Sequence, residues 1–175
     1  MGKIKQMKAR PATPDDAAGI AAIYNQGIED RTATFEIRPR TPADIRAWFD
    51  GRHPIIVVEK DGELAAFAAT SGYRPRACYD GVAEVSVYVA RAFRKQGVGR
   101  LALEGLIAAA EAAGFWKLLS RVFPENTGSR ALIRSLGFRE VGVYEKHGQL
   151  DGVWRDVVIV ERLVPANLNT ASAGS

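Results

Sequence analysis

The sequence predicts an α+β fold, in which a central mixed β-sheet carries helices on both faces. Apolar runs on either side of "DG" at 61–62 indicate an early antiparallel hairpin. A single strand–helix–strand unit lies near the middle of the chain, whereas a doubly wound parallel sheet would repeat this unit. The length of 175 residues suits one domain with a sizeable core.

The first half of the chain predicts one strand, two helices and three strands. "MKARPAT" is a short strand, and Thr13 followed by Pro14 is typical of a helix start. That helix carries apolar residues at helical spacing: Ile20, Ile23, Tyr24 and Ile28. "TPADIRAWF" begins a second helix with the same signal. The next strands are "PIIVVEK", "ELAAFAATSGY" and "VAEVSVYVA".

The second half predicts a helix, a strand, a helix and two strands. The long helix runs from about 97 to 113 and ends at Gly114. "WKLLSRVF" is a strand, and "NTGSRALIRSLGF" is a short helix closed by Gly137. The last two strands, about 138–146 and 153–162, flank "GQLDG".

The two ends of the chain differ from the rest. Residues 1–7 and the small, polar tail 164–175 offer little apolar area to bury, so both are expected to be disordered. Neither a linker nor a repeat interrupts the sequence between them. One domain is therefore predicted over residues 8–163.

Charge and cysteine content narrow the function classes. The formal charge is only +4, and basic residues are scattered among acids, which argues against nucleic acid as a partner. One compact basic cluster suits a small anionic ligand: Arg91, Arg94, Lys95 and Arg100. The single cysteine, Cys78, allows no intramolecular disulfide, so a reducing compartment is expected. Without an apolar run of membrane-spanning length or a signal-peptide core, the cytoplasm is predicted, with no membrane partner. No metal site is expected.

The stretch "RAFRKQGVGRLAL", residues 91–103, places this cluster at the start of the long helix. The first amides of a helix lack internal partners and attract anions, and glycines such as Gly97 and Gly99 permit close approach of a phosphate. A plain turn with a solvated basic face is the open alternative. A dinucleotide-binding fingerprint fits poorly because "RAFRKQ" intervenes and the next strand ends without an acid.

"RKQGVG", after "VSVYV" and before a helix, resembles the acyl-coenzyme A loop of the GNAT acetyltransferases. "ENTGSRALIRSLGF" resembles a second segment of that family, and the likeness extends over about 8–163. It implies a GNAT-like fold with acetyl-CoA as cosubstrate. The backbone of residues 94–99 would hold the pyrophosphate, the edge of "SVYV" the pantetheine arm, and Asn126, which also suits a helix N-cap, would lie beside it. The implied cofactor-binding residues are Val87, Val89, Arg94, Lys95, Gln96, Gly97, Val98, Gly99, Arg100, Asn126 and Ser129.

Upstream residues predict the site of an amine acceptor. Transfer to an amine needs a group that takes its proton, and Glu84 offers a carboxylate within an apolar strand. An outward-facing surface position for Glu84 is the alternative. Just before it, "YRPRACYDG" brings two guanidinium groups and a phenol that suit an acidic ligand, unless this loop is simply solvated.

"YRPRACYDGVAEVSVYV" resembles a stretch of the phosphinothricin N-acetyltransferases, as do "NQGIEDRTATFEIRPRTPADIRAWF" and "GVWRDV". That likeness implies Glu84 as the catalytic base. It implies these substrate-binding residues: Glu29, Phe35, Arg74, Arg76 and Tyr79. It also implies a homodimer, for which the late strand "GVWRDVVIVERL" offers an apolar surface.

The predicted function is acetyl-CoA-dependent acetylation of the α-amine of an anionic amino-acid analogue, of the phosphinothricin, methionine sulfoximine or arsinothricin type. The product would be detoxified, which confers resistance. Open alternatives are another amine (a protein N-terminus, a polyamine or an aminoglycoside) and a non-catalytic acyl-CoA sensor. Ile133 stands where many GNAT enzymes have a tyrosine that acts as general acid, so the thiolate would take its proton from Tyr88 or a water, or leave unassisted. His147 is either a second base or a loop residue.

Overall fold

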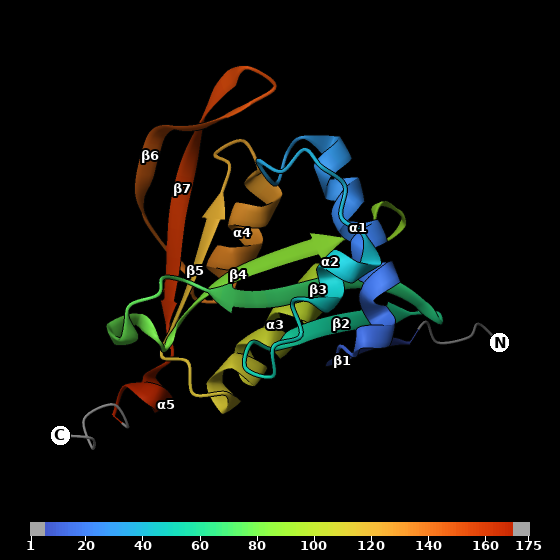
Figure 1. The fold of residues 1–175 in the computed structure, drawn as a ribbon, viewed down its shortest axis with the longest axis horizontal. Helices are drawn as coiled ribbons and strands as arrows, with labels where there is room; N and C mark the ends of the chain where they lie inside the picture. The colour runs from blue at the N-terminus through green and yellow to red at the C-terminus, as the bar shows by residue number, and fades with distance from the viewer. Residues whose placement is uncertain (1–5, 170–175) are drawn as a thin grey trace.

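The computed structural model describes residues 6–169, which form one seven-stranded sheet with helices on both faces (Figure 1). The strand order is β1-β2-β3-β4-β5-β7-β6. The pair β4–β5 is parallel, and the other pairs are antiparallel. The strands are β1 (Met7–Pro11), β2 (Ile55–Lys60), β3 (Glu63–Gly72), β4 (Val82–Val89), β5 (Lys117–Val122), β6 (Arg139–Leu150) and β7 (Val153–Leu163).

The helices divide between the two faces. They are α1 (Ala17–Asp30), α2 (Pro42–Arg46), α3 (Val98–Ala112), α4 (Thr127–Ser135) and the short α5 (Pro165–Leu168). Residues of α1 and α2 share one buried core cluster, and residues of α3 and α4 share the other. The order of elements predicted from the sequence is thereby confirmed, including the central crossover β4–α3–β5.

The apolar character of the central strands follows from this two-sided burial. In β2, Ile56 and Val58 join the core under α3, whereas Ile55 and Val57 join the core under α1. Successive side chains of a strand point to opposite faces, so a strand covered on both faces is apolar at every position. The first four residues of β2, "IIVV", are such a run because this strand lies inside the sheet.

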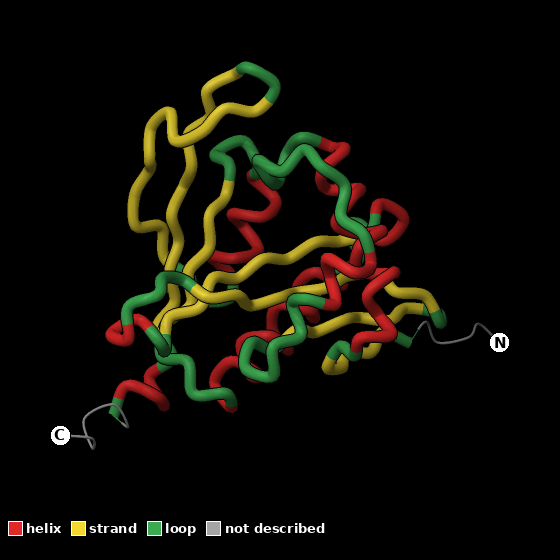
Figure 2. The backbone as a smooth tube through the Cα atoms, in the orientation of Figure 1, coloured by secondary structure: helices red, strands yellow, loops and turns green. Residues whose placement is uncertain are grey.

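The sheet splits between its two parallel strands. Val82–Glu84 of β4 pair with Lys117–Leu119 of β5, and the pairing stops there. Beyond this point β4 continues beside β3 and β5 continues beside β7, so the strands diverge (Figures 1 and 2). At the fork, the Ser120 hydroxyl donates to the Val85 carbonyl over 2.8 Å. One edge of β4 is therefore left without a strand partner.

Several sequence-based boundaries were wrong. Strand β6 continues to Leu150, so the final hairpin turns at Asp151 and Gly152, both with positive φ, rather than through a "GQLDG" loop. A two-residue turn with left-handed residues matches the twist of paired strands. The second helix ends at Arg46, so the rest of "TPADIRAWF" lies outside it.

The tail begins later than expected. Val164 is fully buried and α5 follows it, so the prediction of disorder was wrong for 164–168. Met7 likewise starts β1. Residues 1–5 and 170–175 lie outside the described residues. Within 6–169, no helix is long and apolar enough to cross a membrane.

Candidate active site

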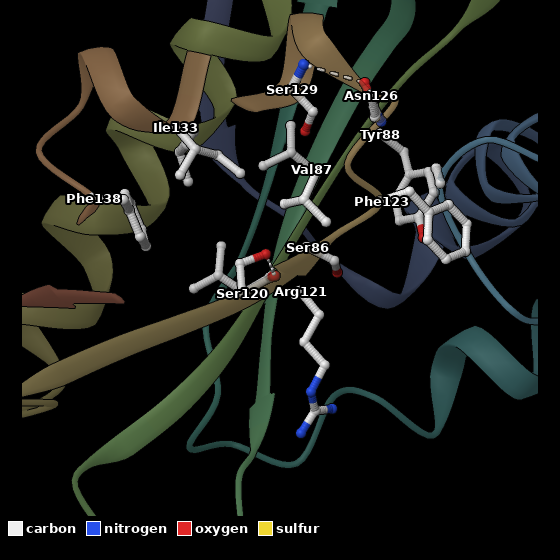
Figure 3. A pocket seen from close by; sticks show the side chains of 14 residues that line it. Ser86, Val87, Tyr88, Ser120, Arg121, Phe123, Asn126, Ser129, Ile133 and Phe138 are labelled. Carbon is white, nitrogen blue, oxygen red and sulfur yellow. Dashed lines mark hydrogen bonds between the residues drawn. The ribbon is translucent and has the colours of Figure 1, made fainter. Parts of the chain in front are cut away.

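A small cavity lies in the fork between β4 and β5. Its volume is about 70 Å³, and α4 closes one side of it (Figure 3). Its small polar side chains are those of Ser86, Ser120, Asn126 and Ser129, Tyr88 and Arg121 also line it, and Val87 adds an apolar wall. Asn126 caps α4 by accepting a hydrogen bond from the Ser129 amide over 3.2 Å. The N-cap interpretation of Asn126 is therefore confirmed, and the residue also faces the cavity.

The N-terminus of α3 has the geometry on which the predicted anion site depends. Gly97 is its N-cap residue with φ 83°, in the left-handed region, and the first helical bond runs from the Leu101 amide to the Gly97 carbonyl. Within residues 6–169, no side chain caps this helix. The early amides of α3 are thus available to an anion, which fits the pyrophosphate of a coenzyme A.

Gly99 has a different reason to be glycine. It is buried, and an added Cβ would lie 3.0 Å from a methyl group of Val89 and 3.6 Å from one of Leu132. The residue lets α3 approach β4 closely. The sequence analysis assigned both glycines the same role, but their surroundings differ, because an added Cβ at Gly97 would meet nothing within 4 Å.

The basic loop is held by acids at the end of α1. Arg91 contacts both Glu29 and Asp30 at 2.8 Å, and Arg94 also pairs with Asp30. Burial raises the pKa of Asp30, but the hydrogen bonds from the two arginines outweigh it and hold the pKa below its usual value. Gln96 accepts a hydrogen bond from Lys60, which fixes the loop to β2.

The remaining loop cations differ in their contacts. Arg100 pairs with Glu104 over 2.8 Å and binds Ser135 over 2.9 Å. Lys95 has φ 60°, and this left-handed residue helps to turn the loop toward the helix. The loop is thus prearranged before any ligand is present.

A larger cleft, of about 700 Å³, opens on the α1 side of the sheet. It shares wall residues with the fork cavity, among them Ser86, Tyr88, Ser120 and Arg121, so the two spaces adjoin each other. Phe35, Arg74, Tyr79 and Glu84 line the cleft, as do Tyr144 and His147. A cosubstrate in the fork and an acceptor in the cleft would meet beside Tyr88.

Glu84 lies at this junction as half of an ion pair. Its carboxylate is 2.9 Å from the guanidinium of Arg121 on β5, and its side chain is 29% exposed. An outward-facing surface position is excluded, because Glu84 lines the cleft. Arg121 belongs to no motif found in the sequence, and only the parallel pairing of β4 with β5 brings it to Glu84.

Two predicted substrate residues lie elsewhere. Within residues 6–169, the wall of the cleft includes neither Glu29 nor Arg76. Glu29 is instead paired with Arg91 in the basic loop. Arg76 precedes the short 3-10 helix Ala77–Tyr79 and is exposed. Their roles toward an acceptor stay predictions.

Tyr88 and Ile133 concern the general acid that would protonate the departing thiolate. Ile133 is buried and lines the fork cavity, where it has no proton to give. Tyr88 lines both cavities and packs between Tyr24 and Phe67, with ring centroids 4.9 Å and 5.4 Å away. Burial raises the pKa of Tyr88, so its hydroxyl keeps its proton well above neutral pH.

The parallel strands β4 and β5 form a fork, and beside it α3 begins at a glycine without a side-chain cap from the described residues. The fork adjoins a cleft, and a carboxylate lies where the two meet. This combination defines an acyl-CoA-dependent acyltransferase. The chain belongs to the acetyltransferase (GNAT) family, whose model matches residues 21–138. Its fold is that of the family, and acetyl-CoA is its cosubstrate.

Individual relatives match along almost the whole chain. The chain is 36% identical to phosphinothricin N-acetyltransferase of Alcaligenes faecalis, over 92% of this chain and 84% of the relative. It is 34% identical to L-methionine sulfoximine/L-methionine sulfone acetyltransferase of Pseudomonas paraeruginosa, over 87% and 91%. The crystal structure of a Sinorhizobium meliloti phosphinothricin acetyltransferase with acetyl-CoA superimposes with a TM-score of 0.84 at 27% identity, over 90% and 88%.

Proposed function

We propose that this enzyme acetylates the α-amine of an anionic amino-acid analogue of the phosphinothricin, methionine sulfoximine or arsinothricin type. The observation that carries the proposal is Glu84 at the junction of the fork and a cleft that also contains Arg74. A carboxylate suits the ammonium group of the acceptor, and the guanidinium suits its acidic end. The names of the relatives point the same way.

Acetyl-CoA supplies the acetyl thioester. The amides at the start of α3, from Gly97 onward, would hold its pyrophosphate, with Lys95 and Arg94 nearby. The open edge of β4 at Val87 and Val89 would pair with the pantetheine arm, and Asn126 and Ser129 would flank it. The cofactor residues named from the sequence thus remain the candidates for this role.

The chemistry needs two proton transfers, for which Glu84 and Tyr88 are the candidates at the junction. Glu84 accepts a proton from the acceptor ammonium, directly or through a water, so that the neutral amine attacks the thioester carbonyl. The carbon–sulfur bond then breaks, and the thiolate takes a proton from the Tyr88 hydroxyl or from a water. The neutral amide product no longer presents a cationic amine, which would detoxify the compound and confer resistance.

Replacing Glu84 by Gln tests this assignment. A general base typically contributes about 10²–10⁴-fold, so turnover should fall by that order at neutral pH. The deficit should shrink at high pH, where the amine is already neutral. Thiol release from acetyl-CoA would be followed over a range of pH with phosphinothricin and methionine sulfoximine, and cofactor affinity by calorimetry.

The rival functions give different results in the same assay. A deficit that is equal at every pH would assign Glu84 a structural role. An acyl-CoA sensor would bind acetyl-CoA without acceptor-dependent thiol release, and Glu84 would be dispensable. Preference for a polyamine, an aminoglycoside or a protein N-terminus in a panel of amines would replace the proposed acceptor class. The cytoplasm remains the predicted compartment.

A further inference from the structure

Arg121 was not predicted from the sequence, yet it touches the proposed catalytic carboxylate. We propose that Arg121 binds the α-carboxylate of the acceptor while Glu84 receives its α-ammonium, so that the Glu84–Arg121 ion pair is exchanged for two ion pairs with an α-amino acid. This assignment rests on the proposed function and narrows it to acceptors with a carboxylate next to the reacting amine.

Register puts the two charged groups side by side at the fork. Glu84 pairs with Leu119 across the parallel strands, and Arg121 lies two residues further along β5, on the same face of the sheet as Leu119. This is where β4 and β5 separate, so the long Arg121 side chain reaches back to the carboxylate at 2.9 Å. Arg121 lines the fork cavity (Figure 3), and it also lines the cleft.

The pair is accessible and exchangeable. The Arg121 side chain is 48% exposed and that of Glu84 is 29% exposed. A partly solvated ion pair of this kind contributes little to stability, so its opening costs little. A bound zwitterion would place its ammonium against Glu84 and its carboxylate against Arg121, so neither side chain would be left unpaired.

The other charges of the cleft are already matched. Among the described residues that line it, Lys117 pairs with Glu161, and Glu36 pairs with Arg40 at 3.0 Å. These partners lie outside the cleft wall. The charges left to meet a ligand there are Glu84, Arg121 and Arg74.

This set is complementary to an amino acid with an acidic side chain. The α-ammonium and α-carboxylate share one carbon, so they need a carboxylate and a guanidinium next to each other, as Glu84 and Arg121 are. The planar fork of Arg binds a carboxylate through two parallel hydrogen bonds. Arg74, which stacks on Tyr73 at 5.1 Å, is left for the acidic end of the side chain.

The test compares two acceptors that differ only in the α-carboxylate: phosphinothricin and 3-aminopropyl(methyl)phosphinate. A charge-assisted hydrogen bond is worth about 1.5–3 kcal/mol, so Arg121→Ala should lower kcat/KM for phosphinothricin by about 10–100-fold. The same variant should leave kcat/KM for the decarboxylated amine nearly unchanged. Arg121→Lys, which keeps the charge without the fork, should lie between the wild type and Arg121→Ala.

Arg134→Ala is the matched control, because Arg134 also forms an exposed ion pair, with Glu140 at 3.1 Å, but lies outside both cavities. Arg134→Ala should leave kcat/KM unchanged for both acceptors. Arg121→Gln serves if the alanine variant melts at a lower temperature than the wild type.

The outcomes separate the two proposals. Equal losses of kcat/KM for both acceptors would show that Arg121 only orients Glu84, which overturns the inference and leaves the proposed function standing. If the wild type releases no thiol with either phosphinothricin or methionine sulfoximine, the proposed function is wrong, and the role of Arg121 is wrong with it.

Discussion

At the scale of single residues, the two arginines that the sequence treated alike have different surroundings. Both are exposed, but Arg74 lines the cleft and stacks on Tyr73, whereas Arg76 lies at the start of a 3-10 helix and outside the cleft wall. A side chain in the cleft wall can contact an acceptor in the ground and transition states. Contact of this kind mainly lowers KM.

Arg74→Ala is therefore expected to raise the KM for phosphinothricin about 10–100-fold and to leave the KM for acetyl-CoA unchanged. Arg76→Ala is the matched control and should have the smaller effect. Steady-state kinetics with each substrate varied in turn would measure both. A larger effect at Arg76, or a raised KM for acetyl-CoA, would contradict this ranking.

At the scale of elements, the start of α3 combines two demands. The helix must lie close against β4, which requires Gly99, and its first turn must be reached through a left-handed residue, which is Gly97. Replacing Gly99 by Val is therefore unsuited as a test of cofactor binding. Overpacking a core costs about 1–3 kcal/mol, so the variant should melt about 2–12 °C lower.

Gly97→Ala is the sharper test of the loop. A left-handed residue with a Cβ costs about 1–2 kcal/mol, and the loop can relieve this strain by leaving the conformation that presents its amides. The KM for acetyl-CoA should rise about tenfold. Gly51 has φ 78° and equally open surroundings but lies in the α2–β2 loop, so Gly51→Ala should carry the same strain without the change in KM.

At the scale of the whole molecule, exposed apolar side chains gather on the final hairpin. They are Val141, Val143, Tyr144, Val153 and Trp154. Strand β7, which contains the apolar surface expected to meet a partner, lies between β5 and β6, and β6 is the outer strand. The surface available to a second copy is therefore the hairpin, which also carries His147 into the cleft.

We expect a homodimer that covers this hairpin. Light scattering at micromolar concentration should give twice the mass of 19.0 kDa, and Trp154→Glu should shift the mass toward the monomer because a charge would be buried in the contact. Trp154 is 56% exposed, so the change should not unfold the chain. A wild type that scatters as a monomer would refute this expectation.

The sequence by itself determined the secondary-structure elements and indicated some candidate residues of the site. Runs such as "IIVVEK", the turn at 61–62 and the helix caps are local signals, so strands, helices and their order could be read from them. Gly97 and Glu84 became candidates for the same reason, since a glycine loop before a helix and an acid within an apolar strand are visible in short windows.

Only the tertiary structure decided which charges meet. Arg121 reaches Glu84 through parallel pairing across a helical crossover, and Glu29 pairs with Arg91 although the sequence predicted it to bind substrate. Such contacts join segments that are far apart in the chain, and the register that creates them depends on how α3 packs on the sheet. A pattern within one segment contains no information about the partner across the fork, so the ion pair at the junction could not be predicted from it.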